Sequence, residues 1–305
     1  MRSIVTAMFF LISLPIISCI EDDECKCSVN NSKTMTSVTF KGVIDPDTAV
    51  KSSMTIPSGI RAIILAYESG DNPVNKSCYP ATPLTVISDQ NGNLLIENEP
   101  SLFMPVGNYD FYAISSNSHY YEEFEIKNGK LRGLKNGKDY LWATKKEMLV
   151  NNSTKVTFEF AHKAVAIVIN FFAGHGVDSL LITNVSVSKS LEDGELALSS
   201  GLITPSTTLS KQTAMVEVYE NSCRWIMLPL SGPSEMPVII DAIVIKGNIK
   251  ETRRYESSLP IEKGIFKEGT MYNYIISVDA ESLSLGKAII TEWKSICMDN
   301  ILVIE

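Results

Sequence analysis

The stretch Val156-Thr157-Phe158-Glu159-Phe160 alternates apolar and polar residues at every position. A period of two predicts a β-strand that turns one face to the core and the other to solvent. The apolar run 164–171 follows it and has the length of a more deeply buried strand. This part of the chain is therefore predicted to form strands.

Strand-like segments recur on both sides of this stretch, separated by turns rich in Gly, Pro and Asn. No segment keeps a convincing helical period over 11 residues or more, and the nearest to one is Asp139–Val150. Many short strands without alternating helices predict an all-β protein built from antiparallel sandwiches. The predicted strands are 38–44, 60–67, 94–96, 109–114, 156–160, 164–171, 181–187, 214–218, 225–228, 238–245, 272–278 and 301–304.

The length of 305 residues corresponds to about two domains. The polar segment Asn151-Asn152-Ser153 is the best boundary, which gives an N-terminal domain over 38–150 and a C-terminal domain over 151–305. The two halves also share a Gly turn that leads into an aromatic strand, at Gly107-Asn108-Tyr109 and at Gly269-Thr270-Met271-Tyr272. We therefore expect two similar domains.

The composition excludes several functions. The net charge of −8 argues against a nucleic-acid-binding protein, because binding phosphates requires a basic face. The three histidines form no metal-binding pattern, and no G-x-S-x-G, G-x-G-x-x-G or phosphate-binding loop is present. We expect no metal, no cofactor and no enzyme activity.

The N-terminus reads as a targeting signal. Arg2 precedes the apolar run 4–17, which is shorter than the roughly 20 residues of a membrane span. The run ends at Ser18-Cys19, which resembles the cleavage site of a bacterial lipoprotein, with Cys19 carrying the lipid. An ordinary signal peptide with an incidental Cys is the alternative. Residues 1–18 are thus the predicted signal peptide, and residues 19–37 a polar tether.

The tether begins with the acidic run Glu21-Asp22-Asp23-Glu24. One interpretation is a solvated spacer. The other comes from a resemblance to the acidic signal that sends lipoproteins to the cell surface of some Gram-negative anaerobes. The predicted location is the outer membrane, lipid-anchored and exposed at the surface.

The remaining cysteines are Cys25, Cys27, Cys78, Cys223 and Cys297, an odd number that cannot pair completely within one chain. Cys223 and Cys297 lie near strand patterns and are predicted to be buried apolar residues, with a bridge between them as the alternative.

Aromatic and histidine residues supply the remaining candidates for a site. His162 is predicted to be a hydrogen-bonded structural residue, and His119 to lie on an exposed loop or edge. Trp225 and Trp293 are predicted to be core residues. Tyr120, Tyr121 and Trp142 are the candidate ligand-binding aromatic residues.

Four segments together resemble the fimbrillin family of pilus subunits from Gram-negative anaerobes. The segments are Pro105–Tyr112, Asp139–Ala143 with its D-x-L-x-A pattern, Val156–Val165 with Phe160-Ala161-His162, and Gly269–Tyr274 followed by Ile290–Trp293. The segment Val156–Val165 resembles the opening strand of the family's second domain.

The resemblance implies two tandem transthyretin-like, Greek-key β-sandwich domains behind the lipoprotein signal and tether. It also implies assembly with other fimbrial subunits by donor-strand exchange, in which a protease removes the first strand and a neighbour's strand replaces it. The removed strand here would be 38–44. The candidate cleavage residues are Lys51 and Arg61, neither of which matches the family pattern well.

The primary hypothesis is a structural or adhesive fimbrial subunit, in a stalk, tip or anchor position, with a host protein or glycan as ligand. The alternative hypothesis is a surface lipoprotein that binds glycans for nutrient capture. The run 301–304 could be a last domain strand or a donor strand.

Overall fold

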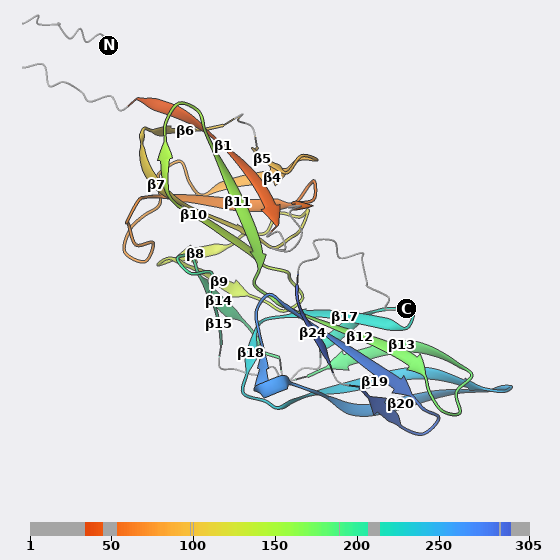
Figure 1. Ribbon diagram of the computed structural model, residues 1–305. Coiled ribbons are helices and arrows are strands. Elements are labelled where there is room, and N and C mark those ends of the chain that lie inside the picture. Colours follow the sequence, from red (N-terminus) through yellow and green to blue (C-terminus); the bar gives the residue numbers. More distant parts are fainter. Residues whose placement is uncertain are drawn as a thin grey trace, which may run out of the picture. The chain divides into compact units, whose positions relative to one another are not determined.

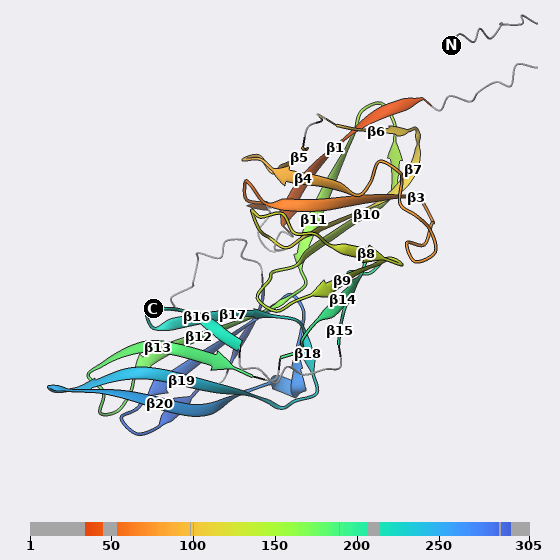
Figure 2. The same cartoon turned by 180° about the vertical axis from the view of Figure 1, so that it is seen from behind.

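The structure is a computed structural model that describes residues 34–44, 54–97, 99, 101–188, 190–206, 214–286 and 288–293. In this part of the chain the regular structure is β-strand, apart from the single 3₁₀ turn η1 (Glu262–Gly264). The all-β prediction is confirmed, and Figures 1 and 2 show the strands gathered into sandwich-like layers.

The first sheet closes on itself. Its strand order is β11-β10-β7-β3-β4-β5-β1, and β11 pairs again with β1. Two short strands, β2 and β6, also pair with β1. The members are β1 (Met35–Ile44), β2 (Met54–Thr55), β3 (Arg61–Glu68), β4 (Leu84–Ser88), β5 (Asn93–Ile96), β6 (Leu102–Pro105), β7 (Gly107–Ser115), β10 (Leu141–Val150) and β11 (Thr154–His162).

The second large sheet has the order β20-β19-β13-β16-β17-β12-β22-β23, with β24 also paired to β22. Its described strands leave β20 at one edge and β23 and β24 at the other. They are β12 (Val165–Ala173), β13 (Ser179–Val187), β16 (Ala214–Tyr219), β17 (Ser222–Met227), β19 (Glu235–Lys246), β20 (Ile249–Pro260), β22 (Thr270–Val278), β23 (Leu283–Leu285) and β24 (Ile289–Glu292).

Two small sheets complete the fold. One has the order β15-β14-β9-β8 and joins strands from the two halves of the chain, because β9 pairs with β14. The other pairs β18 with β21. Their strands are β8 (Glu125–Lys127), β9 (Lys130–Leu134), β14 (Gly194–Ala197), β15 (Ile203–Pro205), β18 (Leu230–Ser231) and β21 (Ile265–Phe266).

The two large sheets share one topological feature. In each, the first strand pairs in parallel with a late strand: β1 with β11, and β12 with β22. The strands that carry the repeated Gly–aromatic pattern, β7 and β22, are both flanked by partners on two sides. Each large sheet thus joins an early and a late strand of its own in parallel.

The change from one sheet to the next lies later than the predicted boundary at residue 150. Strand β11 pairs with β1 and β10, so residues 154–162 belong with the first sheet instead of opening the second. Only Lys163 and Ala164 separate β11 from β12, and both are buried. The division into two domains stays a prediction.

Each large sheet encloses its own apolar cluster, and a third cluster lies between the first sheet and the small four-stranded sheet. Inward-facing residues on alternate positions build the first cluster, as in β11, where Val156, Phe158 and Phe160 are fully buried. The alternation read from the sequence is therefore the origin of the core.

Candidate functional site: the groove occupied by strand β1

Strand β1 is the strand that closes the first sheet. One of its edges pairs in parallel with β11, from Val38 opposite Thr154 to Ile44 opposite Phe160. Its other edge pairs in turn with β6, β5 and β2. Figure 1 shows β1 lying alongside β11. Without β1, the edges of β11, β5 and β6 would lose their hydrogen-bonding partner.

The inward side chains of β1 form part of the first apolar cluster. Val38, Phe40 and Ile44 are at most 3% exposed. The Phe40 ring stacks on Phe158 at 6.0 Å between centroids and meets the edge of Phe111 at 5.9 Å. The space that β1 fills is therefore an apolar groove with aromatic walls.

Hydrogen bonds outside the ladder hold the start of β1. The backbone N–H of Ser153 donates to Oγ1 of Thr36 at 2.9 Å, and the hydroxyls of Ser37 and Ser153 are 3.2 Å apart. These contacts join β1 to the turn between β10 and β11, which fixes its register against β11. A hollow opens beside the strand. It is lined by Thr39 of β1, Leu95 of β5, Lys155 of β11 and neighbouring residues.

The two candidate cleavage residues lie in different surroundings. Lys51 falls in residues 45–53, between β1 and β2, and is outside the described part of the chain. Arg61 is the first residue of β3. Its guanidinium pairs with Glu97, its Nε donates to the carbonyl of His119 at 3.2 Å, and the next residue, Ala62, is 2% exposed.

The candidate ligand-binding aromatic residues do not all share one setting. Tyr120 and Tyr121 lie in the loop between β7 and β8 and are 84% and 59% exposed. They line a small hollow together with Glu122 of the same loop and with residues of the first sheet such as Arg61. Glu122 is held by an ion pair with Lys138. The tyrosines are therefore available to a ligand.

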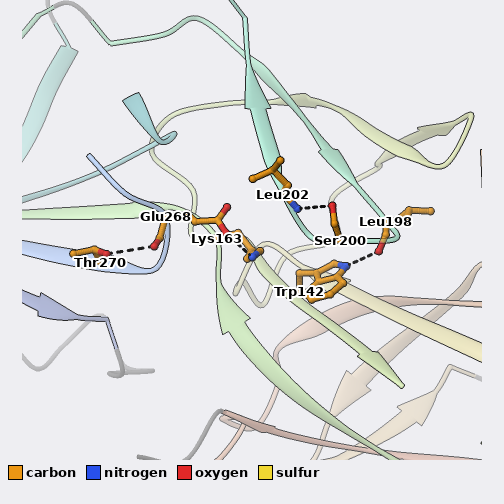
Figure 3. Close-up of polar contacts among 7 residues, drawn as sticks. All are labelled: Trp142, Lys163, Leu198, Ser200, Leu202, Glu268 and Thr270. Carbon is orange, nitrogen blue, oxygen red and sulfur yellow. Dashed lines mark hydrogen bonds and ion pairs between the residues drawn. The ribbon is translucent and has the colours of Figure 1, made fainter. Parts of the chain in front are cut away.

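Trp142, in contrast, is half-buried and packs against the third apolar cluster, and Figure 3 shows its polar contacts. Its indole Nε1 donates to the carbonyl of Leu198 at 3.0 Å, and Nζ of Lys163 lies 5.4 Å from its ring centroid. Lys163 also forms an ion pair with Glu268 at 2.9 Å. Gly201 lies against the indole so closely that a Cβ there would be 2.5 Å from a ring carbon. These contacts give Trp142 a packing role at the junction of the two sheets.

A second group of contacts includes His162 and Trp293, two of the residues predicted to have structural roles. His162 is buried, and its Nδ1 lies 2.8 Å from Oδ1 of Asp139. The other carboxylate oxygen of Asp139, Oδ2, accepts a hydrogen bond from Nδ2 of Asn117 at 2.8 Å. The His162 ring stacks on Trp293 at 4.3 Å. The prediction of a structural His162 is confirmed, as is the burial of Trp293 and Trp225. His119 is exposed, as predicted.

The two described cysteines are free thiols that differ in burial. Cys78 is half-buried and Cys223 is buried, and both are free. Burial raises the pKa of the Cys223 thiol to about 12, although the Ile169 backbone opposes the shift. Cys297, its proposed partner, lies outside the described residues, as do Cys25, Cys27 and the predicted lipidation site Ser18-Cys19.

Within the described ranges, His, Cys, Asp and Glu side chains form no group that could hold a metal ion. In the same ranges, no helix has the length and apolarity needed to cross a membrane.

Residues 32–293 match the model of the fimbrillin-like family, and the chain belongs to that family. It is a fimbrial or adhesion subunit of the cell surface, and it is a structural protein, not an enzyme.

Two solved cell adhesion proteins share the fold, and a third structure also matches. A proposed cell adhesion protein from Bacteroides uniformis is 16% identical with a TM-score of 0.64, covering 84% of this chain and 98% of its own. One from Bacteroides ovatus is also 16% identical, with a TM-score of 0.62 and coverage of 85% and 98%. The tip fimbrial protein Mfa3 from Porphyromonas gingivalis is 8% identical with a TM-score of 0.43, covering 85% and all of its own chain. A comparison with curated proteins returned no significant match.

Proposed function

We propose that this protein is a fimbrial subunit whose first sandwich accepts a strand from a neighbouring subunit in place of β1. The observation that carries the proposal is the position of β1. It closes the first sheet, contributes buried apolar side chains, and is joined to the rest of the chain through residues 45–53. A cut in those residues would leave β1 held by non-covalent contacts alone.

Of the two candidate residues, we favour Lys51 for this cut. The Arg61–Ala62 bond lies inside β3, which pairs with both β4 and β7. A protease binds its substrate in an extended form, so cleavage after Arg61 would require β3 to leave both neighbours. Cleavage after Lys51 would leave the pairing of β3 with β4 and β7 intact and would free residues up to 51.

We also propose that the chain is exported as a lipoprotein on Cys19 and reaches the outer surface of the outer membrane. The support is the sequence alone, from the apolar run 4–17 and the small residue before Cys19. A processed subunit would have lost the lipid, and an anchor would keep it.

Intact mass and N-terminal sequencing of the surface-exposed protein test both steps. A mature N-terminus at residue 52 supports strand removal, and a lipidated Cys19 as the single N-terminus supports a retained anchor. The variant Lys51→Ala should block the first product, whereas Lys127→Ala, at an exposed lysine of β8, should not. A surface-exposed protein that carries neither a lipidated Cys19 nor a new N-terminus within residues 45–62 would contradict the proposal.

Strand exchange itself is tested by mixing. The cleaved protein, mixed with the other fimbrial subunits of the same cell, should form oligomers that resist mild detergent, and the uncleaved protein mixed with them should not. Oligomers that form equally well without cleavage would contradict the mechanism.

A second candidate function is glycan binding by the exposed pair Tyr120 and Tyr121. Aromatic faces stack on sugar rings, and the pair is flanked by the charged side chains of Arg61 and Glu122. Binding of a purified protein to a polysaccharide panel should fall for Tyr120→Ala but not for Tyr219→Ala, an exposed tyrosine of β16. Equal binding by both variants would remove this role from the pair.

A further inference from the structure

Gly42 occupies a position on β1 where a side chain has no room. It belongs to the inward-facing series that includes Val38, Phe40 and Ile44. A Cβ at Gly42 would lie 3.0 Å from Cγ2 of Ile56 and 3.1 Å from Cε2 of Phe160. Ile56 and Phe160 are 1% and 0% exposed, so neither has free space into which to move.

The backbone of Gly42 is also in close contact with a turn. Its N–H donates to the carbonyl of Gly92 at 2.8 Å, and its own carbonyl accepts from Ile56 N–H at 3.3 Å. Gly92 has φ of +74°, and a Cβ there would lie 2.7 Å from the Gly42 carbonyl oxygen. The groove is thus narrowed at this point from two sides, by side chains and by backbone.

The groups that form this narrowing remain after β1 is removed. Ile56 follows the 45–53 segment, Gly92 lies in the turn between β4 and β5, and Phe160 is in β11. A strand that replaces β1 along β11 therefore meets the same wide and narrow places. Wide places take Val38 and the Phe40 ring, and the narrow place takes Gly42.

We propose that this narrowing selects the strand that can occupy the groove. The partner is an extended segment that runs parallel to β11, with an aromatic or large apolar residue at the Phe40 position and Gly two residues later. It carries apolar residues at the Val38 and Ile44 positions, and polar residues are tolerated at the outward Thr39 and Lys41 positions. The proposal rests on the proposed function, because it describes the ligand of the same groove.

The chain's own residues 294–305 do not fit this pattern. Their alternating apolar positions, Ile296, Met298, Leu302 and Ile304, surround Asn300. No register of this segment places Gly, Ala or Ser four residues after an apolar residue that could take the Val38 position. The partner strand is therefore expected from a different chain and not from this tail of a second copy.

Peptide exchange into the cut protein tests the selection. A site-specific protease sequence is inserted after residue 48 of the full chain, the cut strand is removed in denaturant, and the body is refolded with labelled peptides. The peptides are residues 34–45, the same with Gly42→Val, the same with Thr39→Val, and residues 294–305. Thr39→Val is the matched control, because it places the same side chain at an exposed position.

We expect the Gly42→Val peptide to bind about 10–100-fold more weakly than the wild-type peptide, as overpacking of a closed core does. The Thr39→Val peptide should bind within about threefold of wild type, and residues 294–305 should not compete. In the uncut chain, Gly42→Ala should lower the midpoint of urea unfolding relative to Thr39→Ala.

Two failures are distinguishable. Equal binding by the wild-type and Gly42→Val peptides would overturn the selection but leave strand exchange intact. No binding by the wild-type peptide would overturn the proposed function itself.

Discussion

Replacing Phe40 with Ala tests whether β1 is an integral part of the first core. The ring is 2% exposed and contacts Phe158 and Phe111 at centroid distances of 6.0 and 5.9 Å. Truncating a buried Phe to Ala costs about 3–5 kcal/mol, including the cavity that remains. We expect about 4 kcal/mol here, because Phe158, Val38 and the β-sheet backbone around the ring leave little freedom for the cavity to collapse.

The measurement is urea unfolding of the uncut chain, followed by far-ultraviolet circular dichroism. A loss of about 4 kcal/mol is a large share of the 5–15 kcal/mol that stabilises a typical domain, so the unfolding midpoint should fall strongly. Thr39→Ala, on the exposed face of the same strand, should change stability by less than about 0.5 kcal/mol. A loss below about 1 kcal/mol for Phe40→Ala would refute the assignment of β1 to the core.

Three further predictions concern the second sheet. Trp293→Ala removes the ring that stacks on His162, so amide hydrogen exchange in β24 should become faster. Ile290→Ala, at a 38% exposed position, should leave this exchange nearly unchanged. Equal exchange in both variants would argue against an anchoring role of Trp293. Because burial raises the pKa of Cys223 to about 12, peptide mapping after alkylation at pH 8 should show Cys78 modified and Cys223 protected until the protein unfolds; rapid labelling of Cys223 in the native protein would contradict this. Hydrogen bonds from the backbone N–H of His175 and, second, from the hydroxyl of Ser284 lower the pKa of Asp279. Its carboxylate therefore stabilises the fold at pH values above the ordinary pKa of 3.8, and this stabilisation is lost as the pH falls through the lowered pKa. Asp279→Asn should therefore flatten the acid side of the stability–pH curve, and an unchanged slope would exclude the role.

Strands with an uninterrupted alternation could be predicted from the sequence. β11 and β22 are the best examples, since their buried and exposed positions follow the period of two without a break. β10 was ambiguous because its register shifts between Lys145 and Met148, with Glu147 at φ of +54°. A bulge of this kind breaks the alternation and left the segment looking partly helical.

β20 was missed for a different reason. Most of its residues are exposed and polar, so it has little apolar pattern. Its partner β19 was found because alternate residues are buried. The two-residue connection Gly247-Asn248 between them is a hairpin signal that could have revealed β20.

The candidate site depends on pairings that are distant in sequence. That 38–44 is a strand follows from its pattern, but its position between β11 and β5 does not, because local pattern carries no information on which strands pair. The packing of Trp142 could not be predicted either, since the carbonyl, lysine and glycine that contact it lie between 21 and 59 residues further along the chain. Tyr120 and Tyr121 are exposed, as their polar surroundings in the sequence suggest.

The comparison of β1 with β12 explains why the first sandwich is the better candidate to accept a strand. Both strands pair in parallel with a late strand of their sheet, and both lie between two neighbours. β12, however, is bound covalently at both ends, to β11 through the buried Lys163-Ala164 and to β13. One cut cannot release it, because the chain on the other side still holds it in place. No described strand precedes β1, so a single cut in 45–53 separates it from the other strands that the structure describes. The same pairing geometry is therefore a permanent connection in the second half and, as we propose, an exchangeable one in the first.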